Sequence, residues 1–448
     1  MALLVRLLVF LLPFLAAALP AVSERDGPLT PSEDPFYQPP PSWETTPPGT
    51  ILRHRTPPFP IAAFGLAKVN LEAAYQILYR TTNTFGEPIT TVTTILIPHD
   101  ADYTKLLSYQ VAQDAADPSC SPSFALQQFS NAGEALALVM PQLEYLFISS
   151  ALNKGWIVTV PDYLGPKSAY GANIISGQAV LDNIRAALAS TSITSISSRA
   201  AVVMWGYSGG SLASGWAAEL QPLYAPELKI SGAALGGTVP KITPVIDAIN
   251  NGSSAGLLFA GLQGLVNEYP SAADLIRENI VPAKWADFNK TQELCLVGNL
   301  LEYQNEDIYS YFKDGDIFTN PEATKLLNEN AMGQHTPTIP LLIYKSTNDE
   351  ISPVKDTDDL YNTYCLNGAD VKYMRDVLSD HTVLTITGAP DALLWLVDRL
   401  NGVPVRKGCS TTTRLSGLAD PRAIQILGRE IVRLLLGFLQ LPVGPKRR

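Results

Sequence analysis

The chain has 448 residues, of which 46% are hydrophobic and 17% charged, a composition that excludes a wholly disordered chain and a coiled coil. Its 32 lysines and arginines against 42 acidic residues leave a net charge of −10, which argues against nucleic-acid binding driven by net charge. We therefore expect a globular protein, built as two or three units or as one large enzyme fold with insertions, that recognises its partner mainly through shape and apolar surface.

The N-terminus has the pattern of a secretory signal peptide. Arg6 precedes an apolar run over residues 7–19, and the small residues Ala21 and Ser23 follow it. The pattern predicts a signal peptide over residues 1–23 with cleavage after Ser23, and an uncleaved signal anchor is the alternative. Because no later segment has the roughly 20 uninterrupted apolar residues of a membrane-spanning helix, we expect a secreted, extracellular protein without a transmembrane segment.

The cysteines and two glycosylation sequons fit the same compartment. The chain contains four cysteines, Cys120, Cys295, Cys365 and Cys409. An oxidising compartment permits two disulfides, for which four cysteines allow three pairings, and the spacing fits no zinc motif. The sequons at Asn251 and Asn289 predict glycosylation if both lie on the surface.

The chain after the signal peptide begins with a proline-rich arm over residues 24–60, which should run extended over the surface rather than form a helix or a central strand. Beyond it, β-branched segments alternate with helical periodicity, a pattern typical of a largely parallel sheet with crossover helices. Strands are expected at residues 90–97, 105–110, 156–161, 200–205, 230–235, 339–344 and 371–374.

About a hundred residues with helical patterning separate two of these strands. We therefore expect a core over residues 61–239, an inserted helical cap or lid over 240–336, and the rest of the core, with a C-terminal helix, over 337–448. The insertion contains an apolar run at residues 255–262. That run is either a buried helix of a fixed cap or part of a mobile lid that exposes apolar surface.

The most informative motif is Gly206-Tyr207-Ser208-Gly209-Gly210, which follows an apolar strand and precedes a helix of small residues. A serine at a sharp turn between strand and helix has strained backbone angles, and small residues two positions away let the two elements approach. The context predicts that Ser208 is a catalytic nucleophile, against the alternative of a structural serine.

A serine nucleophile needs a base, and the chain offers four histidines. His54 lies in the proline-rich arm and His99 follows an early strand, so neither fits the order serine, acid, histidine of this type of motif. Of the remaining two, His335 precedes the strand that should deliver the acid, whereas His381 lies in a loop after the last recognisable strand. The order favours His381, with His335 as an ordinary loop residue.

The acid should follow a strand before the histidine and accept a hydrogen bond from the imidazole. Asp349 fits this position because it follows the apolar strand at residues 339–344, whereas Glu350 should point elsewhere. The other nearby acids are interpreted as solvated first-turn residues of the next helix, Asp356, Asp358 and Asp359, and as a loop neighbour, Asp380.

The negative oxygen of the expected tetrahedral intermediate also needs hydrogen-bond donors. The backbone N–H of Gly209, the residue after the nucleophile, supplies one. The second should come from the loop after the third strand, where Asp114 is the candidate, although an acidic residue there also fits a helix cap.

Together these motifs resemble the fungal secretory lipase family. The resemblance runs from about residue 35 to the C-terminus and lies in Ser108-Tyr109-Gln110 with Asp114, Cys120-Ser121-Pro122-Ser123, Val160-Pro161-Asp162-Tyr163-Leu164-Gly165-Pro166, the Ser208 motif, and Asp349-Glu350-Ile351 with His381. It implies an α/β-hydrolase fold with helices on both faces of the sheet and a helical cap over the site. The site residues that it implies are a triad of Ser208, Asp349 and His381, an oxyanion hole from Asp114 and Gly209, disulfides Cys120 to Cys295 and Cys365 to Cys409, and Asp162 as a structural turn residue.

The expected activity is that of a secreted serine carboxylic-ester hydrolase, with a triacylglycerol as the leading substrate because an apolar cap suits acyl chains. One alternative is an acetylesterase of a fungal secondary metabolite such as a trichothecene-type sesquiterpenoid, and another is a non-catalytic protein that binds hydrophobic ligands. The acyl-chain preference does not carry over, since the family diverges most in the insertion and in residues 424–441. We expect no metal or organic cofactor, no nucleic-acid partner and a monomer, with a lipid–water interface as a candidate partner.

Overall fold

The computed structural model describes residues 27–63, 67–130, 139–313, 317–417 and 422. The signal peptide expected over residues 1–23 and the helix expected at the C-terminus lie outside the described residues. Within the described ranges, no helix is both long enough and apolar enough to cross a membrane.

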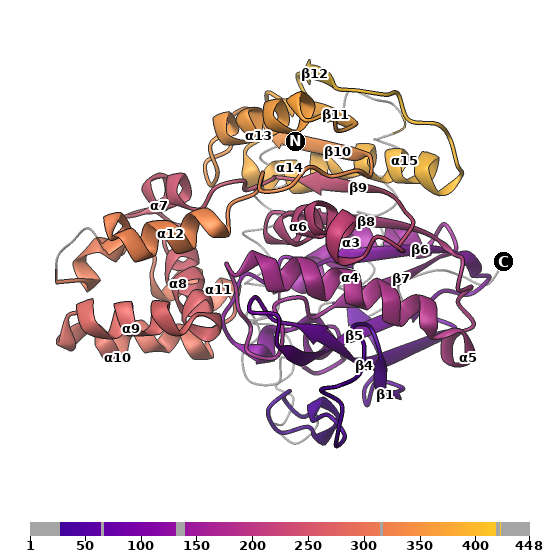
Figure 1. The fold of residues 1–448 in the computed structure, drawn as a ribbon, viewed down its shortest axis with the longest axis horizontal. Coiled ribbons are helices and arrows are strands. Elements are labelled where there is room, and N and C mark those ends of the chain that lie inside the picture. The colour runs from indigo at the N-terminus through magenta and orange to yellow at the C-terminus, as the bar shows by residue number, and fades with distance from the viewer. Residues whose placement is uncertain (1–26, 64–66, 131–138, 314–316, 418–421, 423–448) are drawn as a thin grey trace.

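A ten-stranded sheet forms the centre of the molecule, in the order β1-β4-β5-β7-β6-β8-β9-β10-β11-β12 (Figure 1). The strands from β7 to β12 in this order are parallel, and β5, β4 and β1 add an antiparallel edge next to β7. Their bounds are Ile51–Arg55 (β1), Ala73–Thr82 (β4), Pro88–Ile97 (β5), Asp102–Gln110 (β6), Trp156–Pro161 (β7), Ala201–Tyr207 (β8), Ile230–Gly236 (β9), Leu341–Ser346 (β10), Val371–Asp376 (β11) and Ser410–Arg414 (β12). A separate pair, β2 (Ala62–Ala63) and β3 (Ala67–Lys68), lies outside this sheet.

Helices cover both faces of the sheet. The helices are α2 (Pro122–Ala125), α3 (Val139–Leu152), α4 (Asn173–Ala189), α5 (Thr191–Thr194), α6 (Gly209–Tyr224), α7 (Thr243–Ile249), α8 (Gly256–Glu268), α9 (Pro270–Asn279), α10 (Trp285–Asn289), α11 (Leu296–Glu302), α12 (Pro321–Glu329), α13 (Val354–Leu366), α14 (His381–Thr387) and α15 (Ala389–Leu400). One apolar core lies between the sheet and α4, α6 and α13, and a second lies between the sheet and α3, α14 and α15. A mostly parallel sheet covered in this way is the α/β-hydrolase fold, which confirms the predicted fold class.

Three strands of the sheet were not predicted from the sequence. β4 carries alanine and glutamine among its apolar residues, and it is stabilised by a ten-residue antiparallel pairing with β5. β12 has no apolar side chain and pairs only at the edge, with β11. β1 lies inside the proline-rich arm, but residues 51–55 contain no proline, so their backbone N–H groups are available to pair with β4. The arm therefore contributes an edge strand to the sheet.

The chain between β9 and β10 contributes helices α7 to α12, which lie to one side of the sheet (Figure 1). In its described residues this segment, called here the cap, contains no strand. Its centre is aromatic: the Phe259 ring stacks on Tyr303 with centroids 3.9 Å apart and contacts Tyr311 edge-on. These rings belong to the same apolar cluster that lies between the sheet and α4 and α6, so the cap packs continuously onto the core.

Two disulfides join distant segments. Cys120, in the loop after β6, is bonded to Cys295, at the start of α11, and so ties the core to the cap. Cys365 of α13 is bonded to Cys409, which precedes β12. These are the two pairs that the family resemblance implies.

The sequon asparagines lie in the cap. Asn251 is exposed in the turn between α7 and α8, and Asn289 is partly exposed at the end of α10. Both positions suit a glycan, and glycosylation itself stays a prediction.

Candidate active site

Ser208 occupies a strained turn between β8 and α6. Its backbone angles are φ 51° and ψ −119°, outside the regions that non-glycine residues normally adopt. A Cβ atom on Gly206 would overlap the carbonyl of Gly210, and one on Gly210 would overlap the carbonyl of Gln110 in β6. Only glycine fits these two positions, because the turn brings strand and helix into backbone contact. Ser208 is partly exposed while the residues beside it are buried.

His381 lies next to Ser208. The imidazole Nε2 is 2.9 Å from Ser208 Oγ, and Nδ1 is 2.7 Å from Asp349 Oδ2. His381 was expected in a loop, but it is the first residue of α14, whose N-terminus is capped by Asp380. Its backbone is held on both sides, because its N–H donates to Glu350 Oε2 at 2.7 Å and its carbonyl accepts the Tyr207 hydroxyl at 2.6 Å.

The Asp349 carboxylate is fully buried and accepts hydrogen bonds at both oxygens. Oδ1 accepts the backbone N–H groups of Ile351 and Ser352, at 3.0 and 2.8 Å. Oδ2 accepts His381 and lies 2.8 Å from the buried Nζ of Lys345. Burial raises the pKa of the Asp349 carboxyl, but the hydrogen bonds and charges of His381 and Lys345 outweigh burial and hold the pKa well below its usual range. Asp349 is therefore ionised beside the imidazole.

The other histidines lie elsewhere. His335 donates its backbone N–H to Glu219, His99 contacts Glu72, and His54 pairs with β4. Of the four histidines, the structure brings His381 to Ser208.

The remaining acids have structural contacts. Asp356 is buried, at 7% exposure, so its interpretation as a solvated first-turn residue was wrong: the first turn of α13 packs against the start of the cap, where Lys241 lies 3.7 Å away. Asp358 contacts Tyr373 and Arg375. Asp359 pairs with Lys355.

Asp114 lies in the loop after β6, where it has the left-handed φ of 44° and is buried. It does not cap the 3₁₀ helix that follows, because Asp117 does so. A Cβ atom on Gly209 would overlap the Asp114 carboxyl, so the Asp114 side chain lies against the backbone of Gly209. Burial raises the pKa of Asp114 to about 7, opposed by the charge of His381.

A buried glutamate supports this loop. Glu144 of α3 accepts the Ala112 N–H at 2.8 Å and the Tyr109 hydroxyl at 2.8 Å. Burial raises its pKa to about 8, with the hydrogen bonds opposing the shift. Glu144 therefore holds the chain two residues before Asp114.

Asp162 follows β7 and is buried. It accepts the backbone N–H and the hydroxyl of Ser123, at 2.8 and 2.5 Å, and burial raises its pKa to about 7. These contacts suit a residue that fixes a turn.

Sequence reasoning missed Lys345 and Glu144. Lys345 had one available signal, a lysine directly after the apolar run at residues 339–344 and four residues before the candidate acid. Glu144 had none, because its partners lie about 30 residues away in the chain and meet it only in the folded core.

The candidate residues come from the carboxyl ends of parallel strands: Asp114 after β6, Ser208 after β8, Asp349 after β10 and His381 after β11. A serine, a histidine and an aspartate thus lie in hydrogen-bonded sequence at this edge of the sheet, an arrangement typical of serine hydrolases.

Comparison with known proteins narrows this class. Residues 130–408 match the secretory lipase family. The chain is 50% identical to Lipase A of Arthroderma benhamiae over 95% of this chain and 91% of that protein, and 39% identical to Lipase 5 of Candida albicans over 93% and 91%. The crystal structure of Candida antarctica lipase A in its closed state superposes with a TM-score of 0.79 at 27% identity, over 94% of this chain and 99% of that one. The chain belongs to the secretory lipase family and is a carboxylic ester hydrolase.

Proposed function

We propose that the protein is a secreted triacylglycerol lipase that works through a Ser208, His381 and Asp349 triad and an acyl-enzyme. The observation that carries the mechanism is the unbroken chain of short contacts from Ser208 Oγ through the imidazole to Asp349, at 2.9 and 2.7 Å. Secretion is supported by the membership of the secretory lipase family and by the signal-peptide pattern.

In this mechanism Ser208 Oγ attacks the ester carbonyl while its proton passes to His381 Nε2. Asp349 stabilises the imidazolium that forms, and the backbone N–H groups of Gly209 and Asp114 donate to the oxyanion. His381 then returns the proton to the leaving alcohol. Water, deprotonated by the same imidazole, attacks the acyl-enzyme and releases the carboxylic acid.

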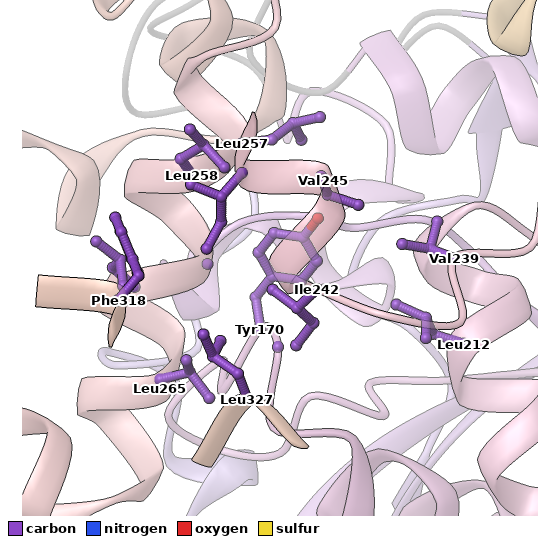
Figure 2. A pocket seen from close by; sticks show the side chains of 14 residues that line it. Tyr170, Leu212, Val239, Ile242, Val245, Leu257, Leu258, Leu265, Phe318 and Leu327 are labelled. Carbon is purple, nitrogen blue, oxygen red and sulfur yellow. The ribbon is translucent and has the colours of Figure 1, made fainter. Parts of the chain in front are cut away.

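The proposed substrate preference rests on an apolar cavity between the core and the cap. Figure 2 shows the 14 residues that line it. None of these described residues has a charged side chain. Leu212 comes from α6 of the core, whereas Val239, Leu258 and Phe318 come from the cap. Leu212 lies one turn of α6 beyond Ser208, with its N–H bonded to the Ser208 carbonyl. Ser208 itself is not among the lining residues, so this one helical turn is what links the cavity to the nucleophile. An apolar cavity so placed suits an acyl chain better than an acetyl group.

The test is active-site labelling with a fluorophosphonate, followed by hydrolysis of p-nitrophenyl esters from two to sixteen carbons. We expect label on Ser208, loss of at least about 10⁴-fold in activity for Ser208→Ala and His381→Ala, and near wild-type activity for His335→Ala. Activity should be higher on long chains than on the acetyl ester. Absence of label would favour a non-catalytic binding protein, and a preference for the acetyl ester and acetylated terpenoids would favour the acetylesterase.

A further inference from the structure

Lys345 is a fully buried charge that the proposed mechanism does not use. It lies in β10, all six residues of which are buried, and its side chain and that of Asp349 are both 0% exposed. Burying an ammonium group is costly unless the group is paired and hydrogen-bonded. The nitrogen contacts two acceptors, Asp349 Oδ2 and the carbonyl of Thr238, each at 2.8 Å.

The position of this charge is specific. Lys345 Nζ and His381 Nδ1 contact the same oxygen of Asp349, at 2.8 and 2.7 Å, so the two nitrogens lie within about 5.5 Å of each other. Thr238 directly precedes Val239, which lines the apolar cavity, so Lys345 also anchors the chain at the entry to the cap. Its removal would leave Asp349 unpaired except for the imidazole and two backbone N–H groups.

We propose that Lys345 is a positioning residue of the site, one that fixes the Asp349 carboxylate and keeps His381 unprotonated at a lower pH than Asp349 alone would allow. The inference rests on the proposed triad. Asp349 favours the imidazolium, and a positive charge on the same carboxylate oxygen weakens that effect. With an effective dielectric constant of about 20, two like charges about 5 Å apart disfavour each other enough to shift a titration by about 2 pH units.

Other charged or titratable groups face the same pair. They are Glu350 after β10, Asp356 of α13 with its partner Lys241, Asp114 in the loop after β6, Asp380 at the start of α14, and the Tyr207 hydroxyl. Of these only Lys241 is a cation, and it is half exposed and paired with Asp356 at 3.7 Å. Because every one of these groups is retained when Lys345 alone is replaced, a change in pH dependence would belong to Lys345.

The experiment measures kcat/KM against pH for the wild type, Lys345→Met and Lys345→Gln. Both replacements remove the charge, and Gln retains a hydrogen-bond donor. The acid limb of this profile is the part in which kcat/KM rises with pH. We expect its midpoint, the pH at which kcat/KM reaches half its maximum, to move upward by about 1 to 2 pH units in both variants. Fluorophosphonate labelling of Ser208 at pH 9, above the acid limb expected for every variant, identifies those that are folded.

The matched control is Thr357→Val. The buried Thr357 hydroxyl donates to the same Thr238 carbonyl at 3.3 Å, so this variant removes a neutral contact and leaves the charge. Its acid limb should not move. An unchanged limb in a folded, labelled Lys345 variant would overturn the proposal, as would a shift in Lys345→Met that is absent in Lys345→Gln. Failure of Ser208 to label in the wild type would instead overturn the triad.

Discussion

At the scale of single residues, the site depends on backbone positions that only particular side chains can occupy. Ser208 adopts φ 51°, and strain of this kind typically costs about 1–3 kcal/mol, which the surrounding elements must offset. They do so because Gly210 packs directly on the backbone of Gln110, the last residue of β6. The same contact sets the distance between the nucleophile turn and the loop that carries Asp114.

We expect Gly210→Ala to reduce kcat/KM by at least about 100-fold, because the new Cβ would overlap a carbonyl oxygen and displace the turn that holds Ser208. Gly215→Ala, in the same helix, is the matched control: there the Cβ would meet the flexible end of Met332, which is free to rotate away. Steady-state kinetics of the two variants, with fluorophosphonate labelling, make the comparison. An equal loss of kcat/KM in both variants would contradict this prediction, because it would show that α6 tolerates no added methyl group at either position.

At the scale of elements, α8 has two different faces. Leu258 and Leu262 line the apolar cavity, whereas Phe259 is buried in the cap between Tyr303 and Tyr311. The apolar run that the sequence showed at residues 255–262 therefore serves two purposes at once. A substitution in this run tests acyl-chain binding only if it is made on the cavity face.

Leu258→Ser should lower kcat/KM for a sixteen-carbon ester about 10-fold more than for an acetyl ester, because only the long chain contacts that wall and a buried leucine side chain is worth about 1.5–3 kcal/mol. Phe259→Ser should instead destabilise the cap by about 3–5 kcal/mol and impair both substrates alike. The measurement is the ratio of kcat/KM for the two esters, together with thermal unfolding. A ratio that stays constant in Leu258→Ser would move the substrate assignment toward short esters.

At the scale of the whole molecule, several carboxyl groups are buried without an ion pair to a lysine or arginine among the described residues. Burial raises the pKa of Asp114 and Asp162 to about 7 and that of Glu144 to about 8. Such groups bind protons more tightly in the folded than in the unfolded protein, so the stability they contribute is complete below their unfolded values near 4 and is lost as the pH rises toward 8. Asp349 acts in the opposite sense. Because its pKa is lowered in the folded protein, it stabilises the fold above pH 4, and this stabilisation is lost in stronger acid.

We therefore expect the melting temperature to be highest at mildly acidic pH and to fall between pH 5 and pH 9. Glu144→Gln, which retains an acceptor for Ala112 and a partner for Tyr109, should be neutral at pH 5 and stabilising at pH 9, by at most about 4 kcal/mol. Glu278→Gln, at an exposed position, is the control, and it should change the stability by the same amount at pH 5 and at pH 9. Calorimetry across this range decides, and a Glu144→Gln effect independent of pH would contradict the assignment.

Whether a feature of this protein could be predicted from the sequence depends on how far apart in the chain the residues that form it lie. The turn around Ser208 depends on neighbours within five residues, and the order of serine, acid and histidine follows from strand order, so these candidates and the fold class could be predicted. β4 and β12 were missed because their pairing with distant strands, rather than their own composition, stabilises them.

Within the site, the sequence by itself determined which residue types were available and on which strands they lie. Only the tertiary structure decided that Asp356 is buried, that His381 begins a helix, and that Lys345 points at Asp349. The reason is physical: burial, hydrogen-bond partners and local charge are properties of groups that meet in space, and Lys345 meets Thr238, a residue more than a hundred positions earlier, only when β9 and β10 pair.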